Sequence, residues 1–501
     1  MTATAGSGQF FKDTGGASMA DTPIERRHRQ FLTNTDTSAL QRIADAYPMP
    51  SEGLGLPPES DQLYRGMIDE DRIDDELYRR YDVKRGLRNA DGSGVLVGLT
   101  TISNVHGYKK VDGKVLPDKG DLQYRGYSIA DLVAGTHGED RFGYEEVAYL
   151  LMAGRLPREA ELDDFKARIG SRRQLPEGYL DIFPRTSYSH SIMNVLQRAT
   201  MLLYAFDPTP DDTNPTHEVD VALSLLGRWP RVASIAHQAA VATVTGERLR
   251  VPPAQESYTV AETILDVLRG EQGFSREEAM LLDVMLMLHA EHGGGNNSSF
   301  TTRVLSSSGT DAYSAYTAAL GSLKGPKHGG ANYKAGEMIN DICDHVRDWG
   351  SDTEVGDYLT QILEGNAFDG TGLIYGLGHA VYTVTDPRAE IVKGYARQLA
   401  EQKGLLDKLE LMERVERLGP QLMHDVRGIT KPISTNIDLY TGFVYSMLGI
   451  PRDLFTPVFA IARMAGWAAH RMEELYGQAR IIRPAYKSVV ESQQYVPIDE
   501  R

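Results

Sequence analysis

The sequence SREEAMLLDVMLMLHAEHGGG, residues 275–295, contains the most strongly apolar helical segment of the chain. Ser275 and Glu278 have the spacing of a capping box, which predicts that a helix begins here. The ten residues Ala279–Leu288 are apolar with one exception, so the helix should be buried on most of its sides. The glycines at 293–295 predict its end. Such a helix belongs to the interior of a large domain.

The segments around this helix continue the helical pattern. Apolar residues recur with helical spacing in 191–206 and 218–229, and the pattern extends from about residue 140 almost to the end of the chain. One stretch differs: residues 95–129 are rich in β-branched side chains and contain an Asp112-Gly113 turn signal. We therefore expect a mainly α fold with a small β-meander near residues 95–129.

Composition excludes several classes of protein. The 501 residues are 41% hydrophobic and 24% charged, which is ordinary globular composition. The sequence contains no run of about eighteen or more apolar residues, so we expect no membrane span. The first residues resemble neither a secretory signal nor a transit signal. The net charge of −16 argues against nucleic-acid and anionic-membrane partners. Cys343 is the only cysteine, which favours a reducing, cytoplasmic location.

Several histidines stand at helix ends or beside glycines. His289 and His292 are three residues apart near the end of the buried helix, so they lie near one face. We favour helix-end histidines that bond the last carbonyl groups, then a ligand-binding role, and last a metal site, because no third ligand is evident. His328 in GPKHGGAN (325–332) follows a helix break, and His379 follows a Gly-Leu-Gly sequence. Taken alone, His328 fits a simple turn.

Three arginines stand in unusual places for an acidic chain. Arg388 follows Asp386-Pro387 at a helix start, where a cation opposes the helix dipole; an anionic ligand or a surface salt bridge would explain it. Arg463 lies inside the apolar run 455–469, and Arg483 stands immediately before a proline. A buried arginine must be paired, and its planar guanidinium prefers a carboxylate or a phosphate.

Asp438 directly precedes an apolar helical segment, where it is either the N-cap or a desolvated carboxylate of raised basicity. The whole set of residues suits the condensation of anionic carbonyl compounds. Arginines would hold substrate carboxylates, a carboxylate would remove a proton from carbon, and histidines would polarise carbonyl oxygens. Neither a complete dinucleotide fingerprint nor a phosphate-binding P-loop is present, so we do not expect an ATPase.

Across roughly residues 95–490, several separate motifs resemble the citrate synthase family in the family's order. They are RGYSI (125–129), LHAEH (288–292), SSG (307–309) with GPKHGGAN (325–332), GLGHAVY (376–382) with DPRAE (386–390), NIDLYTG (436–442), ARMAGW (462–467) and RP (483–484). So many motifs in one order make an accidental similarity very improbable.

The resemblance implies a two-domain citrate synthase fold. It divides the chain into 61–330, the first part of a large helical domain, 331–440, a small helical domain, and 441–501, the C-terminal part of the large domain. A homodimer, or a multiple of dimers, with active sites shared between subunits is also implied. The resemblance does not reach the first 90 residues; there, the Gly, Ser, Thr and Pro content alone predicts that residues 1–60 form a disordered arm and linker.

The resemblance implies an acyltransferase that condenses acetyl-CoA with oxaloacetate. Asp438 would remove a methyl proton of the thioester, His328 would donate a hydrogen bond to the thioester oxygen, and His379 would bind the oxaloacetate carbonyl. The substrate carboxylates would be held by His289, Arg388, Arg463 and Arg483.

The CoA site is less well defined. The loop containing Ile374, Gly376, Leu377 and Gly378 would approach the adenine, and no metal or permanent cofactor is implied. Many relatives carry a basic residue for a CoA phosphate where this chain has Thr383, so we expect Lys431 or arginines to compensate.

Two alternatives keep the same motifs. A 2-methylcitrate synthase would use propionyl-CoA, and its additional methyl group needs only a small change in the pocket. A non-catalytic paralogue that binds CoA or citrate would retain the fold, although retention of all seven polar positions argues against it.

Overall fold

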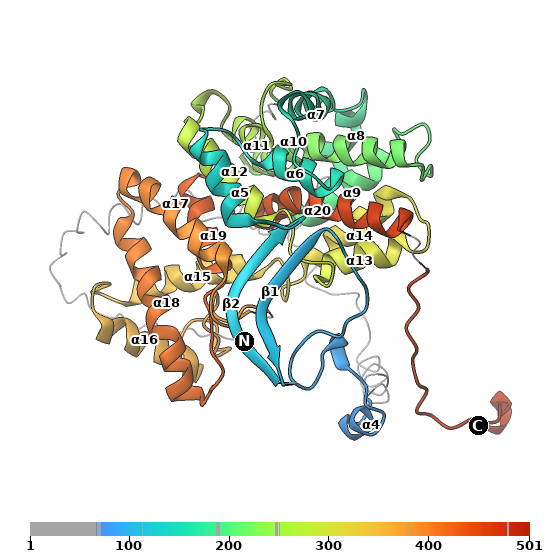
Figure 1. Cartoon of the computed structure of the whole chain (residues 1–501), viewed down its shortest axis with the longest axis vertical. Helices are drawn as coiled ribbons and strands as arrows, with labels where there is room; N and C mark the ends of the chain where they lie inside the picture. Colours follow the sequence, from blue (N-terminus) through green and yellow to red (C-terminus); the bar gives the residue numbers. More distant parts are fainter. Residues whose placement is uncertain are drawn as a thin grey trace, which may run out of the picture.

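The computed structural model describes residues 67, 72–112, 114–186, 191–245, 249, 251–379, 381–477 and 480–501. The protein is mainly helical with one small sheet, as predicted (Figure 1). The expected arm and linker at 1–60 lie outside the described residues. No helix in the described ranges combines the length and apolar character needed to cross a membrane.

The helices follow one another along most of the chain. They are α4 (Asp75–Arg80), α5 (Ile129–Gly138), α6 (Tyr144–Ala153), α7 (Glu159–Ser171), α8 (Tyr179–Thr186), α9 (Ile192–Tyr204), α10 (Pro215–Thr245), α11 (Val260–Arg269), α12 (Arg276–His289), α13 (Asn297–Ser306), α14 (Ala312–Lys324), α15 (Ala331–His345), α16 (Asp352–Glu364), α17 (Pro387–Lys403), α18 (Leu406–Arg427), α19 (Asp438–Met447) and α20 (Phe455–Tyr476).

Helix α12 lies at the centre of the core. Its N-terminus is the predicted capping box: Ser275 Oγ accepts a hydrogen bond from Glu278 N at 3.2 Å, and Glu278 Oε2 accepts one from Ser275 N at 3.1 Å. Every residue from Glu278 to His289 is buried. The helix packs against α5, α6, α11, α17 and α20, which explains why it is apolar on all sides.

The end of α12 differs from the prediction. The helix stops at His289, before the glycines at 293–295. The carbonyl of His289 accepts a hydrogen bond from Arg463 Nε of α20 at 2.7 Å, so a tertiary contact satisfies a carbonyl of the last turn. Residues 290–295 therefore form a turn between α12 and α13, with Gly293 at φ 89°.

The predicted β-meander is present as a three-stranded antiparallel sheet in the order β1-β2-β3. The strands are β1 (Ser103–Val111), β2 (Lys114–Tyr124) and β3 (Tyr127–Ser128). Val111 pairs with Lys114, so the chain reverses at the expected turn, and Asp112 has a φ of 51°.

The hairpin of β1 and β2 packs closely against the segment that precedes α17. A Cβ atom on Gly107 would lie 2.5 Å from the Val381 carbonyl oxygen, and one on Gly120 would lie 2.0 Å from the Thr385 carbonyl oxygen. Both glycines are therefore needed for the close approach of the backbones. Thr383 Oγ1 also donates to the Gly107 carbonyl at 3.3 Å.

Helices α15–α19 form a group beside the remaining helices (Figure 1). Within it α16 packs against α18, and α19 packs against α15 and α17, while α17 also contacts α5 and α12 of the central group. The domain boundary expected after residue 440 falls inside α19, which continues without a break to Met447.

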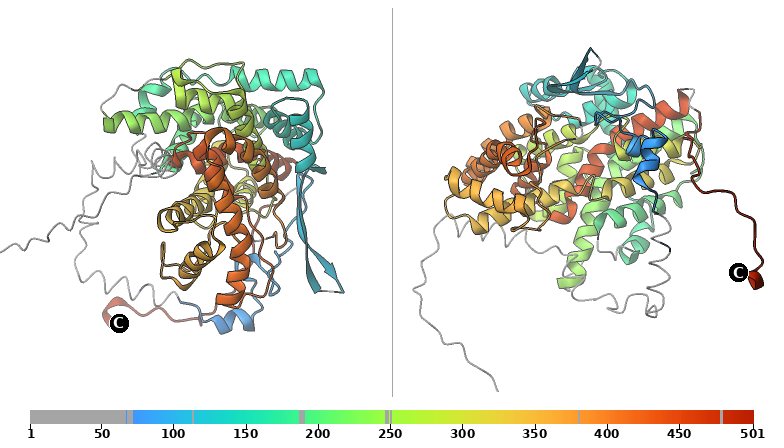
Figure 2. Two further views of the ribbon diagram at one scale, coloured as in Figure 1. Left: turned by 90° about the vertical axis from the view of Figure 1, so that its left-hand side faces the viewer. Right: turned by 90° about the horizontal axis from the view of Figure 1, so that it is seen from below.

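The chain after α20 leaves the helical body. Figures 1 and 2 show the segment 480–501 extending away from it, ending in a short 3-10 helix at Ile498–Glu500. Large apolar side chains of this segment are exposed, among them Tyr486 at 95% and Tyr495 at 81%.

Candidate active site

The loop 374–379 is fixed against the segment that leads into α19. Gly378 N donates to Ser434 O at 2.7 Å, Asn436 N donates to Gly376 O at 2.9 Å, and Asn436 Nδ2 donates to Gly378 O at 2.7 Å. Gly376 and Gly378 have φ values of 87° and 90°, which glycine adopts without strain. These bonds bring His379 close to the start of α19, although nearly sixty residues separate them in sequence.

The backbone decides which nitrogen of His379 carries the proton. Nδ1 accepts hydrogen bonds from Val381 N and Tyr382 N, both at 3.0 Å. A neutral imidazole has one proton, so in His379 it must be on Nε2, which is then a hydrogen-bond donor. Burial and, to a smaller extent, the charge of Arg388 together lower the pKa of His379 to about 4. His379 is therefore a neutral donor at physiological pH.

His292 joins His379 in an aromatic cluster. Its ring lies 5.2 Å from the ring of His379 and 5.4 Å from that of Tyr382, and its Nε2 is 3.2 Å from the Tyr382 hydroxyl. Burial and the charge of Arg388 hold the pKa of His292 well below its usual value. From the sequence, His292 is considered together with His289 as a helix-end, ligand-binding or metal-binding histidine, and the family resemblance gives a substrate role to His289 alone.

His289 lies behind the cluster, inside the core. Its side chain is fully buried, and its Nδ1 donates to the Met285 carbonyl one turn back along α12, at 2.8 Å. This is the contact expected of a helix-end histidine. His289 Nε2, now an acceptor, has no hydrogen-bond partner among the described residues. Burial lowers the pKa of His289 to about 3, so the ring is neutral.

Arg388 occupies the first turn of α17, with Pro387 at the first helical position as predicted. The guanidinium makes a bidentate pair with Asp386: Nε donates to Oδ1 at 3.0 Å and Nη2 donates to Oδ2 at 2.8 Å. The pair is buried, so it is not the surface salt bridge that we had considered. Asp386 Oδ2 also accepts a hydrogen bond from Ile437 N at 3.3 Å, which ties this pair to the start of α19.

Asp438 is the first residue of α19 but does not cap it. Ile437 is the N-cap, with no side-chain hydrogen bond, and Asp438 N itself donates to Asn436 Oδ1 at 3.0 Å. No group in the described chain donates a hydrogen bond to the Asp438 carboxylate. Burial raises the pKa of Asp438 to about 6, although the charge of Arg388 opposes the rise. Of the two interpretations of this residue, the structure therefore favours the carboxylate of raised basicity.

His328 lies at the N-terminal side of α15, with its Nε2 3.0 Å from Ser298 Oγ. The Ser298 hydroxyl donates to Asn296 Oδ1 at 2.9 Å and accepts from Trp467 Nε1 at 3.2 Å, so in this orientation of the Asn296 amide it also accepts from His328 Nε2. Turning the Asn296 amide by half a turn, which exchanges its oxygen and nitrogen, would reverse this arrangement: Nδ2 would donate to Ser298, the serine proton would go to His328 Nε2, and Nδ1 would carry the free N–H. Burial lowers the pKa of His328 to about 4.

Arg463 of α20 is fully buried, and its Nε donates to the His289 carbonyl. Its Nη1 and Nη2 have no hydrogen-bond partner among the described residues. The Phe459 ring packs against this guanidinium, with Arg463 Cζ 4.9 Å from the centre of the ring. The same phenylalanine ring also lies near the rings of His289 and His328. A buried guanidinium with two unpaired nitrogens is the arrangement expected at a site for a planar anion.

The remaining residues of the expected site are Arg483, Ile374, Leu377 and Lys431. Arg483 is exposed on the segment that extends from the body, so the monomer does not bring it to the cluster. Ile374 and Leu377 face inward, since Ile374 is 3% exposed and a Cβ on Gly419 of α18 would be 2.2 Å from Leu377 Cδ1. Lys431 is exposed just after α18.

The tertiary structure thus gathers a neutral histidine donor from a loop with a basic carboxylate and two buried arginines from helices that are distant in sequence. Such a set can hold carboxylates, remove a proton from carbon and stabilise charge on a carbonyl oxygen. The described residues contain no group of three or more His, Cys, Asp or Glu side chains arranged for a metal ion.

Comparisons with known proteins identify the family of this chain. Residues 90–485 match the family description "Citrate synthase, C-terminal domain". The citrate synthase of Haloferax volcanii is 34% identical over 425 residues, which cover 84% of this chain and 99% of that protein. The 2-methylcitrate synthase 1 of Corynebacterium glutamicum is 32% identical over 427 residues, covering 84% of this chain and 98% of that protein.

Solved structures give the same result. The citrate synthase of Thermoplasma acidophilum, in a ternary complex with carboxymethyl coenzyme A and oxaloacetate, superposes with a TM-score of 0.67 at 28% identity. The citrate synthase of Thermotoga maritima superposes with a TM-score of 0.64, also at 28% identity. Each superposition covers 84% of this chain and 99% of the other.

Proposed function

The chain belongs to the citrate synthase family, and we propose that it is a citrate synthase, which condenses acetyl-CoA with oxaloacetate and water to give citrate and CoA. The observation that carries the proposal is the junction of Asp438, His379 and Arg388. The carboxyl group of Asp438, with a pKa of about 6, lies within the field of the buried Arg388. Asn436 bonds both to the loop of His379 and to the backbone of Asp438.

In the proposed reaction, Asp438 removes a methyl proton of acetyl-CoA while His328, in the tautomer that the turned Asn296 amide permits, donates a hydrogen bond from Nδ1 to the thioester oxygen. A thioester α-carbon is a very weak acid, so the base and the hydrogen-bond donor must act together. The resulting enol carbon attacks the ketone carbon of oxaloacetate, and His379 Nε2–H donates to the oxygen on which charge develops. Water then cleaves the new thioester and releases CoA.

The oxaloacetate carboxylates are held by Arg388 and Arg463 from this subunit. The resemblance also implied a histidine that binds a substrate carboxylate. We assign this role to His292 instead of His289, because the His289 ring is fully buried and its Nδ1 already donates to a helix carbonyl. The spacing in HAEH predicts that both histidines lie near one helix face. Because α12 ends at His289, only His289 lies within the helix, and His292 lies in the segment that follows it.

Arg483 is assigned to the active site of a second copy in a homodimer. It is exposed on the extended C-terminal segment, whose large apolar side chains are also exposed. A second copy of the chain would cover this apolar surface and receive the arginine, and two-fold symmetry makes the exchange reciprocal. We also propose the division into a large and a small domain, with the second boundary moved from residue 440 to the end of α19.

One assay tests the reaction and its main alternative. Release of free CoA thiol should require both oxaloacetate and an acyl-CoA, and kcat/KM should be higher for acetyl-CoA than for propionyl-CoA. The reverse preference would support a 2-methylcitrate synthase, the activity named for one of the similar proteins. Absence of oxaloacetate-dependent thiol release from folded protein would instead support a non-catalytic paralogue.

A further inference from the structure

Glu291 is a fully buried carboxylate to which the proposed reaction gives no role. It lies in the turn after α12, between His289, whose carbonyl holds Arg463, and His292 of the aromatic cluster. Its Oε1 accepts three hydrogen bonds, from His470 Nε2 at 2.8 Å, Ser103 Oγ at 2.9 Å and Gly293 N at 2.6 Å. Its Oε2 has no partner among the described residues.

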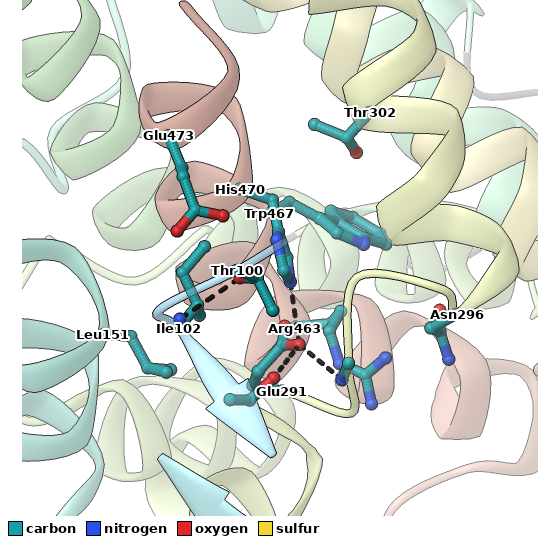
Figure 3. Close-up of polar contacts among 12 residues, drawn as sticks. Thr100, Ile102, Leu151, Glu291, Asn296, Thr302, Arg463, Trp467, His470 and Glu473 are labelled. Atoms are coloured by element: carbon teal, nitrogen blue, oxygen red, sulfur yellow. Dashed lines mark hydrogen bonds and ion pairs between the residues drawn. The ribbon is translucent and has the colours of Figure 1, made fainter. Parts of the chain in front are cut away.

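Helix α20 approaches this carboxylate closely, one turn beyond Arg463. A Cβ atom on Gly466 would lie 2.2 Å from Glu291 Oε2 and 2.5 Å from the Ala290 carbonyl oxygen. Only glycine at 466 therefore permits the contact. Figure 3 shows Glu291 and His470 converging, with Arg463 beside them.

His470 does not neutralise Glu291. Arg303 Nη2 lies 2.7 Å from His470 Nδ1, and since arginine can only donate, Nδ1 must be the acceptor. The single proton of His470 is then on Nε2, which donates to Glu291 as a neutral imidazole. The charge of Arg303 is itself matched by ion pairs with Glu473 and Glu474. Glu291 therefore keeps a negative charge that none of its direct contacts cancels.

The two arginines of the site are matched differently. Arg388 has a direct bidentate partner in Asp386. Arg463 is equally buried, but its terminal nitrogens have no partner in the described chain. A buried charge without a counter-charge strongly destabilises a folded protein. Burial opposes ionisation of Glu291, but the hydrogen bonds from His470 and Ser103 and the charge of Arg463 lower its pKa below the usual value, so the carboxylate is ionised when the site is empty.

We propose that Glu291 is the fixed counter-ion of Arg463 in the free protein, acting through space instead of by a hydrogen bond. His470 and Ser103 hold its carboxylate away from the guanidinium, so Nη1 and Nη2 stay available to an anionic ligand. Glu291 also repels that ligand, which limits its affinity and favours release of the product. The identity of the anion, oxaloacetate, rests on the proposed function; the pairing of the two residues does not.

A ligand-free double-mutant cycle tests the pairing. Glu291→Gln should lower the melting temperature of the wild type, because it leaves the charge of Arg463 unmatched. In an Arg463→Met background the same change should raise the melting temperature, because it then removes an unmatched carboxylate. Glu291→Asp, which keeps the charge, should recover most of the stability. If Glu291→Gln changed the melting temperature equally in both backgrounds, the pairing would be refuted.

Glu218→Gln is a matched control. Glu218 is also a buried carboxylate paired with a buried arginine of α20, Arg471, through two hydrogen bonds of 2.6 Å. This variant should lose stability to the same extent with or without Arg463→Met.

Ligand binding gives a second readout that a purely structural residue would not alter. By calorimetry, Glu291→Gln should bind oxaloacetate roughly tenfold more tightly than the wild type, because a repelling charge is removed. The oxaloacetate-induced rise in melting temperature should grow, whereas Glu218→Gln should show the wild-type rise. Weaker or unchanged binding would overturn the inference. If oxaloacetate did not bind the wild type while the ligand-free cycle still inverted in sign, the proposed function would fail and the pairing would stand.

Discussion

Asp438 should make the condensation depend on pH near 6. With a pKa of about 6, this carboxyl group is about nine-tenths ionised at pH 7 and about one-tenth ionised at pH 5. Because only the carboxylate can accept a proton and this pKa is that of the ligand-free protein, we expect kcat/KM for acetyl-CoA to fall about tenfold between these values. Asp438→Asn should lower kcat by about 100-fold to 10,000-fold at every pH, the usual contribution of a general base.

The histidines of the site should not produce this fall. Burial places the pKa values of His328 and His379 at about 4 and that of His289 at about 3. These rings stay neutral until the pH is about two units lower. A single ionisation near pH 6 in the kcat/KM profile would therefore report Asp438.

The raised pKa of Asp438 should also affect stability. As the pH rises, ionisation of Asp438 should increase activity but decrease the stability of the fold. A raised folded pKa means that folding favours the protonated carboxyl, so the ionised form destabilises the protein above about pH 6 and has no effect below about pH 4. The shift from 3.8 to about 6 corresponds to at most about 3 kcal/mol, and to about 1–2 kcal/mol after allowing for partial exposure. Asp438→Asn should thus be more stable than the wild type at pH 8 and equally stable at pH 4.

The assay combines thiol-release kinetics from pH 5 to 8 with thermal or urea unfolding at pH 4 and pH 8. Asp311→Asn is the control, since Asp311 caps α14 by accepting from Ser314 N at 2.8 Å and asparagine caps equally well. It should keep wild-type activity and stability at both pH values. An Asp438→Asn protein that retained most of its turnover, or that was less stable than the wild type at pH 8, would refute the assignment.

Further predictions concern the surroundings of the site. Gly120→Ala should destabilise the protein by about 1–3 kcal/mol in urea unfolding and raise KM for oxaloacetate, because its Cβ would meet the Thr385 carbonyl; an unchanged KM and melting curve would contradict the close contact. His292→Ala should raise KM for oxaloacetate at least about tenfold with little effect on KM for acetyl-CoA, and equal changes in both would argue against a specific carboxylate contact. Arg483→Ala and Asp438→Ala should each be nearly inactive as homodimers, and dissociated, mixed and reassembled subunits should regain roughly a quarter of wild-type activity; recovery no greater than the sum of the two variants would place Arg483 in its own subunit's site.

Local sequence determined the features that depend on short-range interactions. The capping box of Ser275 and Glu278 and the apolar run after it were sufficient to predict α12 and its burial, because capping and helical periodicity involve residues three or four apart. The hairpin turn at Asp112 and the helix start at Pro387 were predicted for the same reason.

Where α12 ends was not a local matter. The glycines at 293–295 predicted an end a few residues too late, since a hydrogen bond from Arg463, some 174 residues away in sequence, satisfies the His289 carbonyl. That end leaves His289 inside the core and moves His292 into the cluster with His379. From their spacing of three residues, the two histidines have the same candidate roles, and only the tertiary structure distinguishes them.

Residue types and motifs were enough to select the candidate histidines, arginines and carboxylate, because few kinds of chemistry use that combination. Their states were decided by tertiary contacts. Asp438 could have been an N-cap from its position alone; folding instead leaves its carboxylate without a donor and raises its pKa. The proton on His379 Nε2 and the counter-charge for Arg463 likewise depend on groups brought together by folding, since hydrogen bonds and desolvation act through space and the order of residues along the chain does not specify them.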